Sequence, residues 1–212
     1  MYTHEKNVVA YGKPLDQTGK ALIMIHGRGA GAEDILSLHR SLEVGDFTLF
    51  APQATNHSWY PYSFMAPVTQ NQPALDSALE LIGEVVSSIQ DHGINTRDIY
   101  LLGFSQGACL TAEYATRNAQ HYGGLVIFTG GLVGQQISTN NYKGSFHGTP
   151  VLITTGDADP HVPVSRVEET VQIMTELGAD VTRKIYPDRP HTILQEELDL
   201  ANQIFSRPQV RV

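Results

Sequence analysis

The sequence predicts a single α/β domain in which helices cover both faces of a mostly parallel central sheet. Short apolar runs typical of buried strands alternate along the chain with longer segments of helical periodicity. Parallel strands need such crossover segments between them, and strands buried on both faces are apolar throughout rather than alternating. With 212 residues and no linker or repeat, the chain suits one domain over residues 1–212.

The predicted elements are bounded by glycine, proline or polar residues, which mark turns. The expected strands are a weak edge strand at 7–10 and further strands at 21–25, 48–51, 99–102, 125–129, 151–155 and 181–186. The expected helices cover 34–42, 73–91, 108–115, 163–177 and 192–205. Asp34 is the expected N-cap of the first helix, and Gly93 and Gly178 end two others.

The charge balance argues against two classes of partner. The chain holds 14 Lys and Arg against 22 Asp and Glu, a net charge of −8, which disfavours nucleic acid and anionic membranes. The first residues contain no signal-peptide core, and no apolar run is long enough to span a membrane. We therefore expect a cytoplasmic protein that acts on a small molecule. The sequence is also compatible with a homodimer.

The single cysteine, Cys109, cannot form an internal disulfide. It lies on an apolar helical segment, so we interpret it as a buried core thiol, with a redox role as the alternative. The histidines at 57, 121 and 147 show no ligand spacing, and we expect neither a metal nor a cofactor.

A loose dinucleotide fingerprint, Gly27-x-Gly29-x-x-Ala32, follows the strand at 21–25. Nucleotide binding at such a loop requires an acidic residue at the end of the next strand, for the ribose. That strand ends in Ala51-Pro52-Gln53 instead, so we do not expect nucleotide binding.

The most informative motif is Gly103-Phe104-Ser105-Gln106-Gly107, a G-x-S-x-G sequence between a predicted strand and a predicted helix. A serine on a tight strand-to-helix turn has its hydroxyl exposed above the sheet, and the glycines permit the close packing that this turn requires. The context therefore predicts that Ser105 is a nucleophile.

A serine nucleophile needs a base, and the base needs an orienting carboxylate. Two later segments follow predicted strands and so meet Ser105 at one edge of the sheet: 156–163, with Asp157 and Asp159, and 187–191, with His191. The chain order Ser, Asp, His is the one that this architecture uses. Either aspartate suits the acid role; we favour Asp159 and expect Asp157 to fix the turn after Gly156.

The reaction also needs donors for an oxyanion. The backbone N–H of Gln106, next to the nucleophile, is one candidate, and the N–H of Arg28 in the glycine-rich loop 26–31 is the other. The side chain of Arg28 is expected either to be solvated or to steer an anionic ester. His26 is expected to hydrogen-bond the backbone near this loop.

An aromatic run at 58–65 lies on the loop after the strand at 48–51. We predict that Trp59, Tyr60 and Phe64 form the wall of a substrate pocket, with a loop-covering core cluster as the alternative. His161 lies beside the predicted acid and is a further candidate for substrate binding, with simple exposure as its alternative.

With these motifs, the chain resembles the phospholipase/carboxylesterase family of α/β hydrolases, which includes the acyl-protein thioesterases. The matching segments are 26–29, 103–107 and 157–163, together with His191. The resemblance implies that Asp159 is the catalytic acid and that the fold has no large cap and no metal. Arg28 stands where acyl-protein thioesterases carry an apolar residue, which argues against a long fatty-acyl substrate.

The sequence thus predicts a serine hydrolase that cleaves small or exposed carboxylic esters or thioesters through Ser105, His191 and Asp159. Lactone opening, peptide cleavage and perhydrolysis by the same three residues are alternatives. A non-catalytic binding protein on a hydrolase scaffold is a further one.

Overall fold

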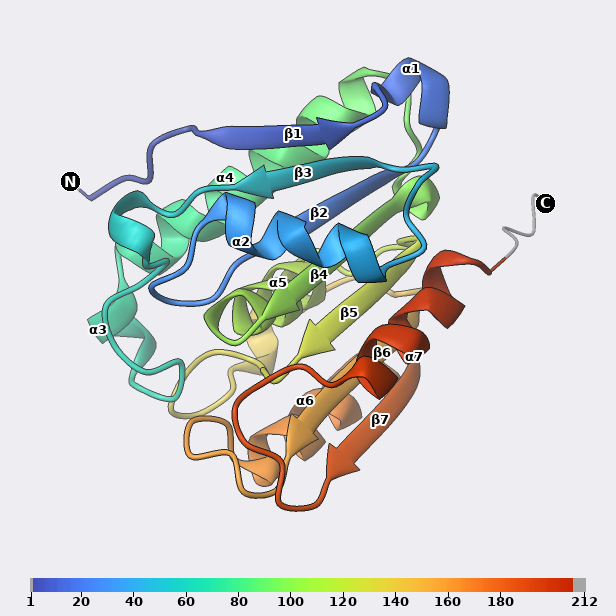
Figure 1. Cartoon of the computed structure of the whole chain (residues 1–212). Coiled ribbons are helices and arrows are strands. Elements are labelled where there is room, and N and C mark those ends of the chain that lie inside the picture. Colours follow the sequence, from blue (N-terminus) through green and yellow to red (C-terminus); the bar gives the residue numbers. More distant parts are fainter. Residues whose placement is uncertain (1, 208–212) are drawn as a thin grey trace.

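The chain folds around one seven-stranded sheet, which the computed structural model shows for residues 2–207 (Figure 1). The strands are β1 (Val8–Gly12), β2 (Ala21–Ile25), β3 (Thr48–Pro52), β4 (Ile99–Phe104), β5 (Gly124–Phe128), β6 (Pro150–Gly156) and β7 (Asp180–Tyr186). The α-helices are α1 (Leu15–Thr18), α2 (Ala32–Leu36), α3 (Val68–Asn71), α4 (Ala74–Asp91), α5 (Gln106–Arg117), α6 (Val164–Glu176) and α7 (Gln195–Phe205).

The strand order is β1-β3-β2-β4-β5-β6-β7, and only the edge strand β1 runs antiparallel to its neighbour. The remaining pairs are parallel because helical crossovers return the chain to the same end of the sheet each time. The predicted α/β architecture is therefore confirmed. No large cap domain covers the sheet in the described part of the chain.

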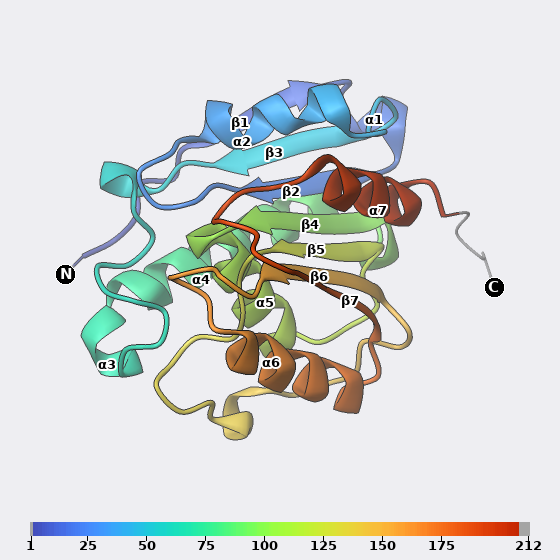
Figure 2. The same ribbon diagram turned by 60° about the horizontal axis from the view of Figure 1, so that its bottom comes forward.

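Helices cover both faces of the sheet, as the sequence predicts. Figure 2 shows α2 and α7 on one face and α4, α5 and α6 on the other. Along β2 the side chains alternate between two apolar cores: Leu22 and Met24 pack on the α2/α7 side, and Ile23 and Ile25 pack on the opposite side. Burial on both faces explains why the central strands are apolar throughout.

Three local expectations need correction. Asp34 is not the N-cap of α2; the helix begins at Ala32, and the Asp34 carboxylate accepts a hydrogen bond from the N–H of Gly31 at 2.7 Å. The predicted helix 34–42 also continues as a 3₁₀ helix over Ser37–Ser41. The last helix begins at Gln195 rather than at 192, because the Glu197 carboxylate holds the N–H of Leu194 at 2.7 Å.

Parallel strands bring distant segments together at the carboxyl edge of the sheet. Strand β4 ends at Phe104, β6 ends at Gly156 and β7 ends at Tyr186. Because these strands point the same way, the residues that follow them lie at one edge. This is the edge at which open α/β sheets bind ligands.

Helix α5 lies unusually close to strand β2, and a glycine makes this approach possible. A Cβ atom on Gly107 would stand 2.0 Å from the carbonyl oxygen of Ile25 and 2.6 Å from that of His26. No side chain fits there without movement of the backbone. The contact fixes the first turn of α5 against the sheet.

We therefore expect Gly107→Ala to lower the free energy of unfolding by about 2 kcal/mol or more, because the added methyl group overlaps backbone atoms of β2. Gly45→Ala is the matched control, since a Cβ atom on Gly45 would meet no other atom within 4 Å. The control should change stability by less than about 0.5 kcal/mol. Urea unfolding measures both, and equal stability of the two variants would contradict the packing argument.

Candidate active site

Ser105 occupies the turn between β4 and α5 in a strained backbone conformation. Its φ is 56° and its ψ is −120°, which non-glycine residues rarely adopt. The turn is held by a hydrogen bond from the N–H of Ser105 to the carbonyl of Phe128 on β5, at 3.0 Å. Gly103 lies so close to Gly107 that an added Cβ would stand 2.3 Å from the carbonyl oxygen of Gly107. Packing on both sides therefore maintains the strain.

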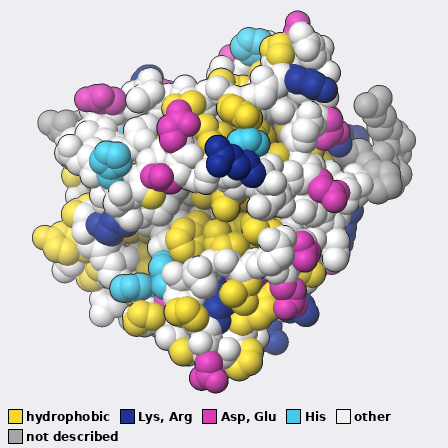
Figure 3. Space-filling view, viewed as in Figure 1, with side chains coloured by type: hydrophobic (Ala, Val, Ile, Leu, Met, Phe, Trp, Pro, Cys, Tyr) yellow, Lys and Arg dark blue, Asp and Glu magenta, His cyan; other side chains and the backbone are white. Residues whose placement is uncertain are grey.

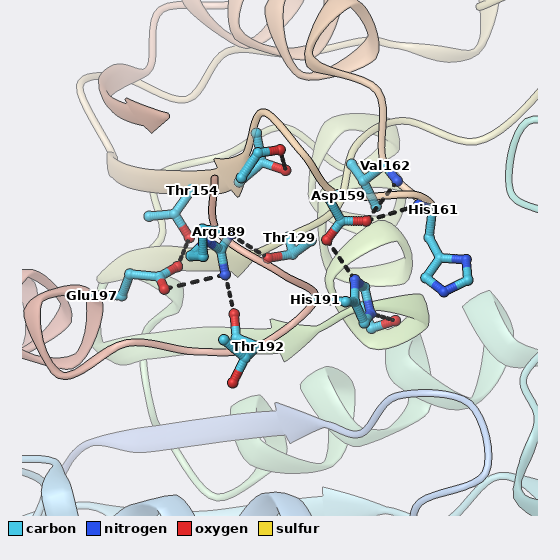
Figure 4. A network of polar contacts seen from close by, with 12 residues as sticks. Thr129, Thr154, Asp159, His161, Val162, Arg189, His191, Thr192 and Glu197 are labelled. Carbon is cyan, nitrogen blue, oxygen red and sulfur yellow. Dashed lines mark hydrogen bonds and ion pairs between the residues drawn. The ribbon is translucent and has the colours of Figure 1, made fainter. Parts of the chain in front are cut away.

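A chain of two hydrogen bonds links Ser105, His191 and Asp159. Nε2 of His191 lies 2.7 Å from Oγ of Ser105. Nδ1 of His191 lies 2.7 Å from Oδ2 of Asp159 (Figure 4). The structure thus brings together the three residues that the sequence suggests as a triad. They come from the loops after β4, β6 and β7.

Asp159 is held in place by backbone donors. Its second oxygen, Oδ1, accepts hydrogen bonds from the N–H groups of His161 and Val162 at 2.8 and 3.0 Å. Burial raises the pKa of Asp159, but these bonds and the contact with His191 lower it more, so the net pKa lies below its ordinary value. The carboxylate is therefore ionised at neutral pH.

The ionised carboxylate decides which nitrogen of His191 carries the proton. An ionised Asp159 only accepts hydrogen bonds, so Nδ1 must be the protonated nitrogen of a neutral imidazole. This leaves the lone pair of Nε2 facing the hydroxyl of Ser105, which donates to it. The arrangement suits removal of the serine proton.

Asp157 has a different task from Asp159. Its Oδ1 accepts a hydrogen bond from the N–H of Asp188 at 2.8 Å, across to the loop that precedes His191. The sequence led us to expect a local bond within the turn after Gly156. The structure shows instead that Asp157 joins the loop after β6 to the loop after β7.

Residues 187–194, which include His191, form neither helix nor strand. The helix predicted over 192–205 would have placed His191 at the opening of the last helix, and this was wrong, because α7 begins at Gln195. The His191 ring packs against the rings of Phe104 and His161, with centroid distances of 5.1 and 5.0 Å. The position of the imidazole is thus set by side-chain contacts and not by regular backbone structure.

The glycine-rich loop after β2 lies directly against the nucleophile. A Cβ atom on Gly27 would stand 3.3 Å from Cβ of Ser105. The next residue along the loop is Arg28. On the other side of the nucleophile, Gln106 is the first residue of α5, where a backbone N–H has no acceptor within the helix. The loop after β2 and the first turn of α5 thus both lie beside Ser105. His26 supports the loop as expected: its Nδ1 lies 2.8 Å from the carbonyl oxygen of Gly27.

A cavity of about 620 Å³ opens beside the nucleophile. Its lining includes Ser105, His191 and, of the predicted binding residues, Tyr60, Phe64 and His161. Six further lining residues were not predicted, although the first three belong to the same aromatic run: Pro61, Tyr62, Ser63, Cys109, Pro160 and Val162. Figure 3 shows acidic side chains scattered over one face of the molecule rather than gathered into one patch.

Trp59 does not line the cavity, contrary to the prediction. Its side chain is completely buried, its indole N–H donates to the carbonyl of His26 at 2.9 Å, and its ring packs 5.0 Å from the His26 ring. An aromatic run on a loop does not reveal which of its rings face inward. Trp59 belongs to the core beneath the site.

Gln106 holds the aromatic run through its side chain, which the sequence analysis did not foresee. Its Oε1 accepts the N–H of Trp59 at 3.0 Å, and its Nε2 donates to the carbonyl of Tyr60 at 2.8 Å. The residue after the nucleophile therefore also positions a wall of the cavity.

Arg28 holds the same wall from the other end. Its guanidinium donates to Oγ of Ser58 at 2.9 Å and to the carbonyls of Pro61 and Tyr62 at 3.0 and 2.8 Å. The side chain is exposed, as one of the two expectations had it, but its three hydrogen bonds to this loop were not predicted. Arg28 clamps the loop 58–62.

Cys109 is buried, as expected, and burial raises the pKa of its thiol to about 12. The thiol is therefore protonated and unreactive at neutral pH.

Among residues 2–207 there is no cluster of three or more His, Cys, Asp or Glu side chains that could hold a metal ion. Within the same range no helix is long and apolar enough to cross a membrane.

The parallel sheet and the strained serine turn between β4 and α5 are those of an α/β hydrolase. Residues 6–206 match the model of the Phospholipase/Carboxylesterase family. The chain belongs to this family of hydrolases.

Individual relatives agree with the family. The chain is 57% identical to a phospholipase/carboxylesterase from Dyadobacter fermentans, whose crystal structure superimposes with a TM-score of 0.96 over 97% of this chain and 99% of that one. It is 27% identical to a probable carboxylesterase SOBER1-like protein of Arabidopsis thaliana, over 84% of this chain and 74% of the relative. It is also 32% identical to acyl-protein thioesterase 1 of Gibberella zeae, over 57% of this chain and 52% of the relative.

The lowered pKa of Asp159 predicts a pH-dependent contribution to stability. Because the pKa is lower in the folded than in the unfolded protein, the contribution is complete above the unfolded pKa of about 3.9 and is lost as pH falls through the folded pKa. We expect the difference in free energy of unfolding between the wild type and Asp159→Asn to stay constant above about pH 5 and to shrink as pH falls from there through the unfolded pKa of about 3.9 toward the lower folded pKa.

Urea unfolding at each pH measures this difference. Asp91→Asn, at an exposed position, is the control and should give a difference that does not follow the same course. A difference for Asp159→Asn that stays constant with pH would contradict the hydrogen-bonded, ionised carboxylate.

The Arg28 clamp predicts local mobility in its absence. Arg28→Ala removes three hydrogen bonds, so we expect faster amide hydrogen exchange in residues 58–62 and little change in β4 or β5. Arg40→Ala, at an exposed position, removes the same charge and should leave exchange in 58–62 unchanged. If both variants exchange like the wild type, Arg28 does not hold this loop.

Proposed function

We propose that the protein hydrolyses small or exposed carboxylic esters or thioesters, with Ser105 as nucleophile, His191 as general base and acid, and Asp159 as the group that orients His191. The observation that carries this proposal is the pair of 2.7 Å hydrogen bonds that joins the three side chains. Membership in the phospholipase/carboxylesterase family supports the same reaction class.

In the first half of the reaction, Oγ of Ser105 attacks the substrate carbonyl while its proton passes to Nε2 of His191. Asp159 stabilises the imidazolium that forms, through the bond to Nδ1. The backbone N–H groups of Arg28 and Gln106 are the proposed donors to the oxyanion. Arg28 follows Gly27, which packs against Ser105, and Gln106 begins α5, so these donors would need no rearrangement as charge develops.

The first tetrahedral intermediate then collapses, as His191 donates the proton to the leaving alkoxide or thiolate. An acyl-enzyme on Ser105 remains, and its hydrolysis is the second half of the reaction. Water then enters, gives a proton to Nε2 of His191 and attacks the acyl carbonyl. Collapse of this second intermediate returns the proton to Oγ of Ser105 and releases the carboxylic acid. Atoms and protons balance without a cofactor.

The cavity supports substrates of modest size. Its volume of about 620 Å³ and its lining by Tyr60, Phe64 and Val162 suit a small acyl or alcohol group with apolar surface. Lactones, peptides and peracids would use the same three side chains, and no contact in the site favours them over simple esters.

Family membership alone does not establish catalysis. One relative, 26% identical over 50% of this chain, is called a probable inactive carboxylesterase in Oryza sativa subsp. japonica. Activity is supported by the geometry around Ser105 in this chain, which a non-catalytic binding protein would not need.

Ser105→Ala should abolish hydrolysis of p-nitrophenyl acetate, because no other hydroxyl lies at Nε2 of His191 in the described part of the chain. The far-ultraviolet circular dichroism and the melting temperature should show that the variant is folded. Turnover equal to that of the wild type would remove Ser105 from the mechanism.

The two aspartates should respond differently to the same substitution. Asp159→Asn removes the charge that orients and stabilises the imidazolium, and we expect kcat to fall by about 10²-fold or more. Asp157→Asn keeps an oxygen that can accept the N–H of Asp188, so its kcat should change by less than about 3-fold. Equal losses in the two variants would contradict the assignment of the acid.

A further inference from the structure

One buried ion pair has one member before His191 in the sequence and the other member after it. Arg189 and Glu197 face each other with Nη1 and Oε2 3.3 Å apart, and their side chains are only 2% and 0% exposed. Neither residue lines the cavity or touches Ser105. The pair therefore plays no direct part in the proposed chemistry.

Each member of the pair makes one contact with the sheet. Nη2 of Arg189 donates to Oγ1 of Thr129, just after β5, at 2.7 Å. Oγ1 of Thr154 on β6 donates to Oε1 of Glu197. Thr129 and Thr154 are themselves joined, by a hydrogen bond of 2.8 Å from the N–H of Thr129 to the carbonyl of Thr154. The pair is thus attached to the carboxyl edge of the sheet.

Each member also makes one contact with the loop that carries His191. Nη1 of Arg189 donates to the carbonyl of Thr192, and Oε2 of Glu197 accepts the N–H of Leu194 at 2.7 Å. Figure 4 shows this network beside His191 and Asp159, with Arg189 between Thr129, Thr192 and Glu197. The loop is therefore tied to the sheet both before and after His191.

The backbone of Arg189 is fixed as well. A Cβ atom on Gly156 would stand 2.2 Å from the carbonyl oxygen of Arg189, so the loop rests directly on the end of β6. The carboxylate of Asp159 is three residues further along the chain from this contact. The same region therefore sets the distance between the acid and the base.

A contribution to the stability of the fold does not by itself explain a buried ion pair at this position. Removing two charges from water is costly, and uncharged side chains of similar volume often serve a fold equally well. A fork-shaped guanidinium with several fixed acceptors does something an apolar side chain cannot, since it defines directions as well as distances. The loop 187–194 has no helix or strand to provide them.

We propose that Arg189 and Glu197 are positioning residues that hold the imidazole of His191 between Ser105 and Asp159. The proposal rests on the proposed function of these three residues. Displacement of a catalytic group by about 1 Å costs on the order of 10²-fold in rate. Loss of the pair should therefore lower kcat, while KM, which depends on the cavity wall, should stay within about 2-fold.

The test uses the double variant Arg189→Met/Glu197→Gln, which removes both charges and keeps an acceptor for the N–H of Leu194. A single substitution leaves one buried charge unpaired and should destabilise the protein strongly. The double variant should recover most of that stability. Its kcat for p-nitrophenyl acetate should nevertheless stay about 10- to 100-fold below that of the wild type.

If kcat of the double variant equals that of the wild type, the pair does not position His191. Arg189→Lys gives a second measurement that does not depend on the double variant being folded. It keeps the charge opposite Glu197 but cannot direct separate N–H groups at Thr129 and Thr192. A drop in kcat with unchanged KM supports the proposal, and an unchanged kcat overturns it.

Two controls separate this proposal from the proposed function. Arg183 and Glu168 form an ion pair whose side chains are 43% and 45% exposed, and Arg183→Met/Glu168→Gln should leave kcat and KM unchanged. His191→Ala is measured in the same assay. An active His191→Ala would refute the proposed function itself, whereas an inactive one beside a fully active double variant would refute only the positioning role.

Discussion

The close contact between helix α5 and strand β2 is the constraint on which the site depends. Gly107 lies against the carbonyl of Ile25, and this contact holds the turn in which Ser105 has a φ of 56°. The strain is maintained because α5, β2 and β4 pack around the turn in a core that buries nearly every neighbouring side chain. As a result, the serine hydroxyl stands at the carboxyl edge of the sheet, where the loops after β6 and β7 also arrive.

The three members of the site are fixed by different means. Ser105 is held by backbone packing, and Asp159 is held by the N–H groups of its own turn. His191 lies on a loop without regular structure, so its place depends on side chains that reach back to the sheet. This division suggests why a buried ion pair occurs beside His191 and not beside the other two.

Much of this was accessible from the sequence, and the reasons are physical. Apolar strands, periodic helices and the glycines around Ser105 have local signatures, and chain order then places 103–107, 156–163 and 187–191 at one edge. Side-chain direction on loops has no such signature. The sequence therefore could not show that Tyr60 lines the cavity whereas Trp59 lies in the core beneath it. Nor could it show that Arg28 holds the loop 58–62. Arg189 and Glu197 flank His191 in the sequence, but nothing there shows that they face each other.

The proposed reaction requires that Ser105 be an activated nucleophile. The most direct measurement is reaction with a fluorophosphonate probe, followed by intact-mass analysis and peptide mapping. The hydrogen bonds of His191 predict one adduct per chain, located on Ser105, and its loss in His191→Ala. An unlabelled wild-type protein, or an adduct on another residue, would show that Ser105 is not the activated nucleophile.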